Sequence, residues 1–349
     1  MSIQLTEVNK RYGSFDALKN ISMQVRPGSL SSVLGPSGSG KTTMLSIVAG
    51  ISPPTSGKIE IAGVDLTDAP AAQRNVGLVF QSYALFPHLT VFENIAFPLR
   101  VRRRPDDVVK RLVAQALDRV RLGKFSRRKP SELSGGQQQR VAIARAIVFQ
   151  PDVLLLDEPL AALDRKLREE VRIELRQLQR ELGITTLLVT HDQDEALSMA
   201  DEVIIMSEGR IQQVDAPEEA YHKPANEFVA NFLGIANLFR GKVTEDSAPY
   251  IELSGGDRIV VDAGSLPSSR REVLGMLRPE QLTIVDADSA GALPVKVFER
   301  VFLGESTRYL MRTERGCTVT VNSGVKRKVA IGDQVGLTWD PKGVWLLPA

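Results

Sequence analysis

The sequence predicts an α/β fold built on a mainly parallel sheet, followed by a smaller all-β domain. Residues 29–34, 76–80 and 185–190 have the pattern of short buried strands, and the continuous apolar run at residues 153–156 is typical of a central strand of a parallel sheet. Segments with helical periodicity lie between these runs, and this alternation favours a parallel α/β arrangement. After about Asn237 the pattern changes to short β-like runs punctuated by Gly and Pro, which predict a small barrel or sandwich.

The remaining elements of the first domain follow from local periodicity. From the N-terminus they are a strand at 3–8, a strand at 59–63, a mostly helical stretch at 91–147, a charged amphipathic helix at 165–182, a helix from 194 and a hairpin at 203–214. We therefore expect one domain over residues 1–235, with a helical subdomain at about 90–150, and a β domain over residues 236–349.

Composition narrows the class of protein. With 349 residues the chain is longer than an average domain, and a hydrophobic content of 43% is sufficient for buried cores. The net charge of +2 is too small to argue by itself for nucleic acid as a partner. The single cysteine, Cys317, leaves no intrachain disulfide and no cysteine zinc cluster, which fits a reducing compartment. We expect no signal peptide and no membrane-spanning segment, so a role at a membrane would require a partner.

A glycine-rich loop between a predicted strand and a predicted helix is the first chemical motif. It matches G-x-x-x-x-G-K-[ST], and the candidate nucleotide contacts are Gly35, Pro36, Ser37, Gly38, Ser39, Gly40, Lys41, Thr42 and Thr43. Phosphate oxygens crowd against backbone N–H groups, so the loop needs residues without bulk and with free φ/ψ. The following helix adds the positive end of its dipole. Lys41 would reach the β- and γ-phosphates of ATP, and the Thr42 hydroxyl would ligate Mg²⁺.

Two acids at the end of the strand predicted at residues 153–156 are the second motif. The strand delivers Asp157 to the edge of the sheet, where its carboxylate would hold Mg²⁺ through the water shell. The adjacent Glu158 is placed to polarise an attacking water as a general base. A buried strand with solvated acids at its end would look the same, but a phosphate loop upstream favours the catalytic interpretation.

A third motif identifies a family. Ser134, Gly135, Gly136 and Gln137 follow a leucine and precede a predicted helix, and this sequence resembles the signature of ATP-binding cassette (ABC) ATPases. A serine and two glycines at a helix start form an anion site, which would be redundant beside the first phosphate cradle of the same chain. The resemblance implies that the signature of one copy closes on the ATP held by another, in a homodimer of two cassettes.

Three further residues match the family in chain order. Gln81 corresponds to the glutamine that senses Mg²⁺ and the γ-phosphate, and is therefore a candidate metal contact as well as a candidate catalytic residue. His191 corresponds to the switch histidine, which would contact the γ-phosphate and help orient the catalytic water or Glu158. Tyr12 corresponds to the aromatic residue that stacks on adenine.

The D-loop departs from the usual pattern. The family commonly has Ser-Ala-Leu-Asp, whereas this chain has Ala161, Ala162, Leu163 and Asp164. The missing hydroxyl removes a cross-subunit hydrogen bond, while Asp164 remains a candidate nucleotide-site residue. We expect altered coupling between subunits without loss of hydrolysis.

The segment after Gln81 points to a transporter. Residues 83–94 are unusually apolar and aromatic for a loop, and in the family this region receives a helix from an integral-membrane permease. Part of this segment would also belong to the core of the helical subdomain. The resemblance implies a peripheral position on the cytoplasmic side of the inner membrane, with a solute-binding protein as an indirect partner. A DNA-repair or translation ATPase would carry a coiled-coil insertion or a tandem cassette, and the sequence contains neither.

The second domain and the solute are less constrained. Residues 221–241 and 277–280 resemble the linker and a motif of the β domain appended to bacterial solute-importer ATPases. The resemblance implies an oligonucleotide-binding-like shape for this domain, although shape does not fix its role. We expect a dimerising or regulatory role, because the domain has no dense basic–aromatic stripe for nucleic acid. Residues 1–240 resemble most the spermidine/putrescine type, with sulfate, iron(III), phosphonate and sugar importers as alternatives. Two basic runs, at residues 102–104 and 127–129, fit solvated faces, or lipid or nucleic-acid patches.

Overall fold

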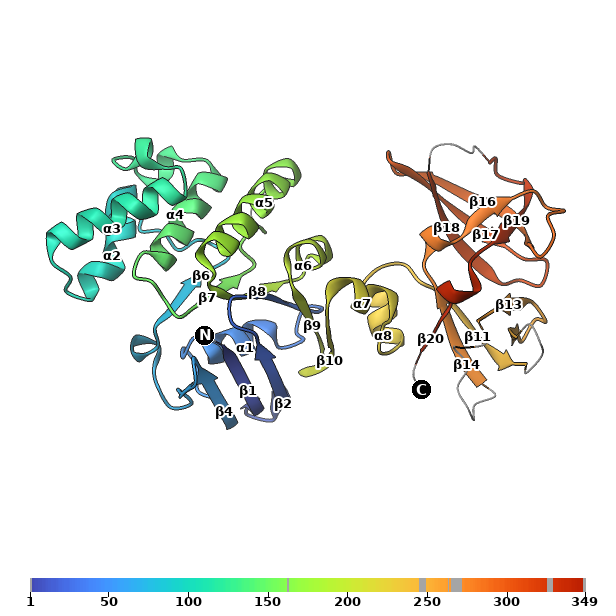
Figure 1. Cartoon of the computed structure of the whole chain (residues 1–349), viewed down its shortest axis with the longest axis horizontal. Helices are drawn as coiled ribbons and strands as arrows, with labels where there is room; N and C mark the ends of the chain where they lie inside the picture. The colour runs from blue at the N-terminus through green and yellow to red at the C-terminus, as the bar shows by residue number, and fades with distance from the viewer. Residues whose placement is uncertain are drawn as a thin grey trace. The chain divides into compact units, whose positions relative to one another are not determined.

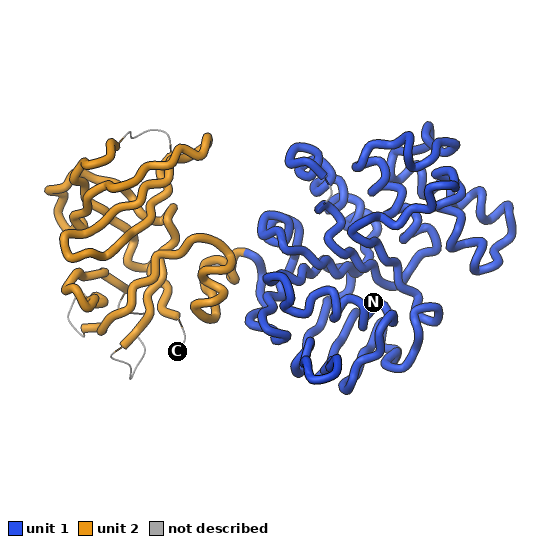
Figure 2. Tube along the Cα trace, turned by 180° about the vertical axis from the view of Figure 1, so that it is seen from behind, with its two compact units in different colours: residues 1–217 blue, residues 218–349 orange. Residues whose placement is uncertain are grey.

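The computed structural model describes residues 2–161, 163–244, 249–262, 264, 272–324 and 329–347. The chain forms two compact units, residues 1–217 and residues 218–349, coloured separately in Figure 2. Each unit has its own hydrophobic core. Among the described residues, no helix combines the length and the apolar character needed to cross a membrane.

A six-stranded sheet forms the centre of the first unit (Figure 1). In spatial order its strands are β10 (Arg210–Asp215), β9 (Glu202–Ser207), β3 (Leu30–Leu34), β8 (Thr185–Thr190), β7 (Val153–Asp157) and β6 (Val76–Val79). All neighbouring pairs are parallel except β9 with β10. The strands β3 and β8 are buried at every position, which explains their continuous apolar and small-residue sequences. The mainly parallel α/β sheet expected from the sequence is confirmed.

A second sheet in this unit is antiparallel. Its strands, in spatial order, are β2 (Phe15–Val25), β1 (Ile3–Tyr12), β4 (Ser56–Ile61) and β5 (Val64–Asp65). The helix α1 (Lys41–Val48) shares one apolar cluster with both sheets, since Met44 and Ile47 pack with Ile3 and Val33. This core fixes the start of α1, and hence the loop before it, against the central sheet.

Helices on the other side of the central sheet form the helical layer. They are α2 (Val91–Val101), α3 (Asp106–Arg119), α4 (Gly135–Ile147), α5 (Arg165–Leu182) and α6 (Gln193–Met199). Capping boxes start two of them: Thr90 with Glu93 at α2, and Ser134 with Gln137 at α4. One face of α4 packs against α2 and α3, and the opposite face packs against β7 and α5. The helix α4 therefore joins the helical subdomain to the central sheet.

The second unit contains two antiparallel five-stranded sheets around one core, together with two short helices, α7 (Pro217–His222) and α8 (Glu227–Phe232). The first sheet consists of β13 (Arg258–Val260), β12 (Tyr250–Leu253), β11 (Asn237–Val243), β14 (Glu272–Leu277) and β20 (Trp345–Leu346). The second consists of β15 (Thr283–Val285), β19 (Gln334–Thr338), β16 (Leu293–Phe302), β17 (Ser306–Arg312) and β18 (Thr318–Gly324). The all-β character expected after Asn237 is confirmed.

The division between the units falls after Pro217, earlier than the boundary at residue 235 expected from the sequence. The buried Arg278 explains the difference, because its guanidinium donates to the carbonyls of Tyr221, Ala230 and Ile235 at 2.8–3.2 Å. The guanidinium also stacks on the Tyr221 ring, 4.1 Å from its centroid. These contacts hold α7, α8 and the following segment to the β sheets, so the segment expected to be a linker is part of the second unit.

We expect Arg278→Met to destabilise the second unit by roughly 3–5 kcal/mol, because several buried carbonyls lose a charged donor. Urea unfolding followed by tryptophan fluorescence measures this directly, since both tryptophans, Trp339 and Trp345, lie in the second unit. The matched control is Arg240→Met, which removes only an exposed ion pair with Glu227 and is expected to cost less than about 1 kcal/mol. Equal losses in the two variants would contradict the role given to Arg278.

Candidate nucleotide-binding and hydrolysis site

The loop between β3 and α1 has the backbone that its glycines were expected to provide. Gly38 and Gly40 have φ of +79° and +102°, in the region that favours glycine. A Cβ at Gly40 would lie 2.7 Å from the Ala17 carbonyl oxygen, and one at Gly35 would lie 2.3 Å from that of Met206. Gly38 instead faces open space. Two glycines are thus required by close packing beneath the loop, and the third by its backbone conformation on the exposed side.

Lys41 is the first residue of α1 and is held over this loop. Its ammonium donates to the carbonyls of Gly35 at 2.7 Å and Pro36 at 2.9 Å, and the side chain is buried. Burial lowers the pKa of Lys41, and the nearby carboxylates of Glu158 and Asp157 oppose that shift. The cation therefore sits between a helix N-terminus and two acids, where a phosphate chain would bring compensating charge.

The carboxyl ends of three adjacent parallel strands bring the predicted catalytic residues together. Gln81 follows β6, Glu158 follows β7 and His191 follows β8, and these strands are neighbours in the sheet. The Gln81 amide donates to one oxygen of Glu158 at 3.0 Å, and the other oxygen lies 3.0 Å from Nδ1 of His191. Both contacts orient the same carboxylate, as expected of a group that must point at a water molecule.

The backbone at Glu158 adds to this orientation. Its φ is +44°, a left-handed conformation that costs a non-glycine residue roughly 1–2 kcal/mol. Its N–H donates to the Val189 carbonyl of β8 at 2.8 Å, which helps to hold the turn. Strain of this kind is common at sites that require a particular side-chain orientation, and here it directs the carboxylate toward Gln81 and His191.

Asp157 is the last residue of β7. Burial raises the pKa of Asp157, the neighbouring Glu158 raises it further, and Lys41 lowers it. No cluster of three or more metal-ligating side chains occurs among the described residues. Magnesium bound with a nucleotide needs only one or two protein ligands, because waters and phosphate oxygens fill its other positions. Asp157 interacts electrostatically with Lys41, the residue before the exposed Thr42 of α1, and a single acid in this position suits that chemistry.

The remaining predicted residues lie apart from this group. Tyr12 ends β1 with half its surface exposed, and the Lys10 ammonium lies 4.9 Å from its ring centroid. Ser134 caps α4 together with Gln137, and Gly135 and Gly136 form its first turn. The Asp164 carboxylate caps α5 by accepting from Leu167 N–H at 3.0 Å. Ala162 of the D-loop lies outside the described residues.

One residue of this region was missed in the sequence. Arg145, near the end of α4, donates to the carbonyls of Tyr83 and Ala84, at 2.7 Å in each case. Tyr83 and Ala84 have φ of +60° and +45°, two successive left-handed residues directly after the Gln81 turn. This half-buried guanidinium therefore connects a strained segment to α4, the helix whose first turn is the signature. A single arginine within an apolar helical pattern gave no sequence signal for such a contact.

The fold and this constellation define the class: a P-loop ATPase in which the phosphate loop follows β3, while Asp157 and Glu158 lie at the end of β7 in the same parallel sheet. Residues 18–161 match the family model described as ABC transporter, and residues 275–347 match the model described as TOBE domain. The chain belongs to the ABC transporter family and is an ATP-binding, ATP-hydrolysing subunit of the importer type.

Similarity to curated relatives extends over the full chain. The spermidine/putrescine import ATP-binding protein PotA of Rubrobacter xylanophilus is 45% identical, with 99% of this chain and 94% of the relative covered. The Fe(3+) ions import ATP-binding protein FbpC of Brucella abortus is 41% identical, with 99% and 98% covered. Among solved structures, MJ0796 as a dimer in a post-hydrolysis state bound to ADP and Pi is 34% identical, has a TM-score of 0.54, and covers 62% of this chain and 98% of its own. The cbiO1 protein of Clostridium perfringens is 33% identical, has a TM-score of 0.59, and covers 63% and 90%.

We expect Arg145→Met to lower kcat for ATP hydrolysis about tenfold and to change ATP affinity less than threefold, because the segment after Gln81 loses two charged contacts while the phosphate loop stays intact. Arg145→Lys should restore part of kcat. The discriminating measurement repeats Arg145→Met in a Gln81→Ala background, where kcat should fall by less than about twofold. A full tenfold fall there would show that Arg145 does not act through Gln81.

Proposed function

We propose that the reaction is Mg²⁺-dependent ATP hydrolysis carried out by the residues that meet at the ends of β6, β7 and β8. Thr42 and Asp157 would hold Mg²⁺, with Gln81 sensing it, and Lys41 would bind the phosphates. Glu158 would accept a proton from the attacking water while His191 orients it. The two 3.0 Å contacts of the Glu158 carboxylate carry this assignment.

A second copy of the chain would complete the site. The signature at Ser134, Gly135, Gly136 and Gln137 offers the N-terminus of a 13-residue helix to an anion, yet none of its described interactions reaches the phosphate loop. Two solved structures of MJ0796 are dimeric, one of them bound to ADP and Pi. We infer a homodimer in which each signature covers the nucleotide of the partner, with Asp164 near the same interface and Tyr12 stacked on adenine.

The segment after Gln81 would receive an integral-membrane permease. The Phe86 and Phe97 rings pack with their centroids 4.6 Å apart, and Phe97 remains 41% exposed. An exposed aromatic surface next to the γ-phosphate sensor suits a contact that transmits closure of the two cassettes. The chain would then lie at the cytoplasmic side of the inner membrane as a peripheral subunit, served indirectly by a solute-binding protein.

A polyamine is the solute that we infer. PotA relatives from three organisms, at 42–45% identity over 99% of the chain, are spermidine/putrescine import proteins. Iron(III) is the second candidate, because FbpC of Brucella abortus is almost as similar. Sulfate, phosphonate and sugar remain alternatives within the same class of importer. The nucleotide site itself carries no information on the solute.

We expect Glu158→Gln to retain ATP binding and to slow hydrolysis by at least about 100-fold, within the range for loss of a general base. The glutamine keeps the size of the side chain but no longer takes up a proton. Phosphate release and nucleotide binding by the purified chain measure the two effects. The control is Glu170→Gln on α5, an exposed acid, which should hydrolyse ATP at the wild-type rate. Hydrolysis by Glu158→Gln within about threefold of wild type would overturn the base assignment.

The same variant separates the solute candidates. In cells that lack this chain, the wild-type protein should restore uptake of labelled spermidine, and Glu158→Gln should not. Uptake of Fe(3+) in the same cells should be unaffected. Restored Fe(3+) uptake without spermidine uptake would contradict polyamine as the solute and identify iron(III) instead. It would not affect the proposed mechanism of ATP hydrolysis.

A further inference from the structure

The positive charge of the chain is concentrated in one region of the helical layer. Residues 100–129 contain twelve Lys and Arg against three Asp and no Glu, a net charge of +9, so the rest of the chain carries −7. All twelve cations are exposed. None of them forms an ion pair within the described residues. An unpaired excess of this size is more than a solvated helix face requires.

The densest part is the basic tip, which we define as Arg100, Arg102, Arg103 and Arg104 at the C-terminal end of α2. The tip is an ordered turn, because Arg103 N–H donates to the Arg100 carbonyl at 2.8 Å and Arg104 N–H donates to that of Leu99 at 3.1 Å. The Arg102 guanidinium stacks 3.8 Å from the centroid of the Phe149 ring. Partial burial lowers the pKa of Arg102, and the charge of the neighbouring Arg104 lowers it further.

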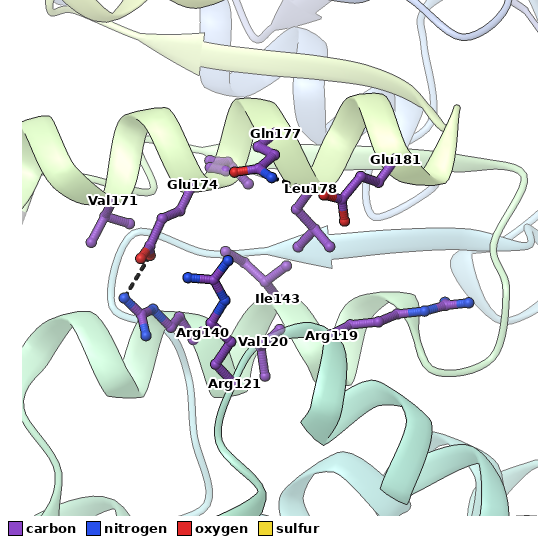
Figure 3. A pocket seen from close by; sticks show the side chains of 11 residues that line it. Arg119, Val120, Arg121, Arg140, Ile143, Val171, Glu174, Gln177, Leu178 and Glu181 are labelled. Atoms are coloured by element: carbon purple, nitrogen blue, oxygen red, sulfur yellow. Dashed lines mark hydrogen bonds and ion pairs between the residues drawn. The ribbon is translucent and has the colours of Figure 1, made fainter.

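The surroundings of the basic tip do not neutralise it. Asp106 and Asp107 lie in the first turn of α3, where they favour the helix dipole, and neither forms an ion pair. Glu93, farther back on α2, is occupied in the capping box with Thr90. The other end of α3 differs, since Arg119 and Arg121 line a pocket whose facing wall carries Glu174 and Glu181 of α5 (Figure 3). Arg119 and Arg121 thus face two acids across this pocket, whereas the four arginines of the basic tip do not line it.

Exposed apolar side chains lie beside the basic tip on the same helix. Phe97 and Val101 are 41% and 64% exposed and stand one turn apart on α2. Phe97 packs against Phe86 of the segment that would receive the permease. The basic tip is therefore continuous with the proposed permease-binding surface. Binding of the permease at that surface would bring the basic tip toward the bilayer in which the permease is embedded.

We propose that the basic tip binds the anionic phospholipid headgroups that surround the permease, with Phe97 and Val101 at the headgroup boundary. Four cations beside exposed apolar groups are the combination that favours the interface of an anionic membrane. Nucleic acid fits less well, because a single strand requires successive aromatic platforms for its bases. The Phe149 ring under the tip is covered by Arg102, and Phe97 beside the tip offers a single partly exposed ring. A role of the basic tip in orienting the cassette at the membrane rests on the proposed function, because it requires the permease. The contact between the basic tip and anionic lipid does not require the permease.

The test uses the full chain and sedimented vesicles of phosphatidylcholine, with or without about one quarter phosphatidylglycerol, at about 0.1 M salt. We expect binding only to the anionic vesicles, with a steep loss when the salt is raised to about 0.5 M. The variant R100Q/R103Q/R104Q retains Arg102 and its stacking on Phe149. Its partition constant should fall about 100-fold, about the value expected for three cations at an anionic surface.

The matched control K242Q/K296Q/R300Q removes three exposed cations from the second unit and should partition within about twofold of wild type. Equal losses in the two variants, or equal binding of wild type to neutral vesicles, would overturn the proposal. So would tighter binding of a single-stranded RNA than of anionic vesicles, with the same loss in the basic-tip variant. Basal ATP hydrolysis in solution, measured on the same samples, should be unchanged in both variants; its absence in the wild type would count against the proposed function alone.

Discussion

The position of one carboxylate, that of Glu158, depends on the order of the parallel strands. The neighbours of β7 are β6 and β8, so the residues that follow these three strands emerge at one edge of the sheet. Gln81 and His191 then reach the two oxygens of Glu158 from either side. The left-handed backbone at Glu158 and its N–H contact with Val189 complete the arrangement. With a different strand order, Gln81, Glu158 and His191 would lie too far apart to contact one another.

The segment after Gln81 connects this edge of the sheet to the helical layer. The segment after Gln81 is strained at Tyr83 and Ala84 and is held by Arg145 of α4, whose first turn is the signature. One helix therefore joins the surface that would face a partner cassette to the segment that would face a permease. Movement of Gln81 toward a γ-phosphate would therefore shift both the signature surface and the permease-facing segment, because packed helices move as units.

Much of the first unit could be predicted from the sequence, because its signals are local. Short stretches of apolar and small residues located the buried strands, and the phosphate loop, the paired acids and the signature each have a short-range chemical reason. The contacts of Arg145 and Arg278 could not be predicted, since each arginine binds carbonyls of segments far away in the sequence. Residues 221–241 resemble a linker, because neither their contacts with Arg278 nor the pairing of β11 with β12 and β14 is visible in their own periodicity. The roles of Ser134, Tyr12 and Asp164 toward nucleotide stay predictions, because their described contacts are a helix cap, a cation and a second helix cap.

The central claim is that a complete ATP site needs the phosphate loop of one copy and the signature of another. Disulfide cross-linking between two differently labelled proteins tests it most directly, with Cys317→Ser in both, Ser37→Cys in one and Ser134→Cys in the other. Oxidation of the mixture with ATP should give a covalent dimer containing one chain of each kind, and neither protein alone should give one. Absence of that dimer from the ATP-bound mixture, or its equal formation by either protein alone, would contradict the account.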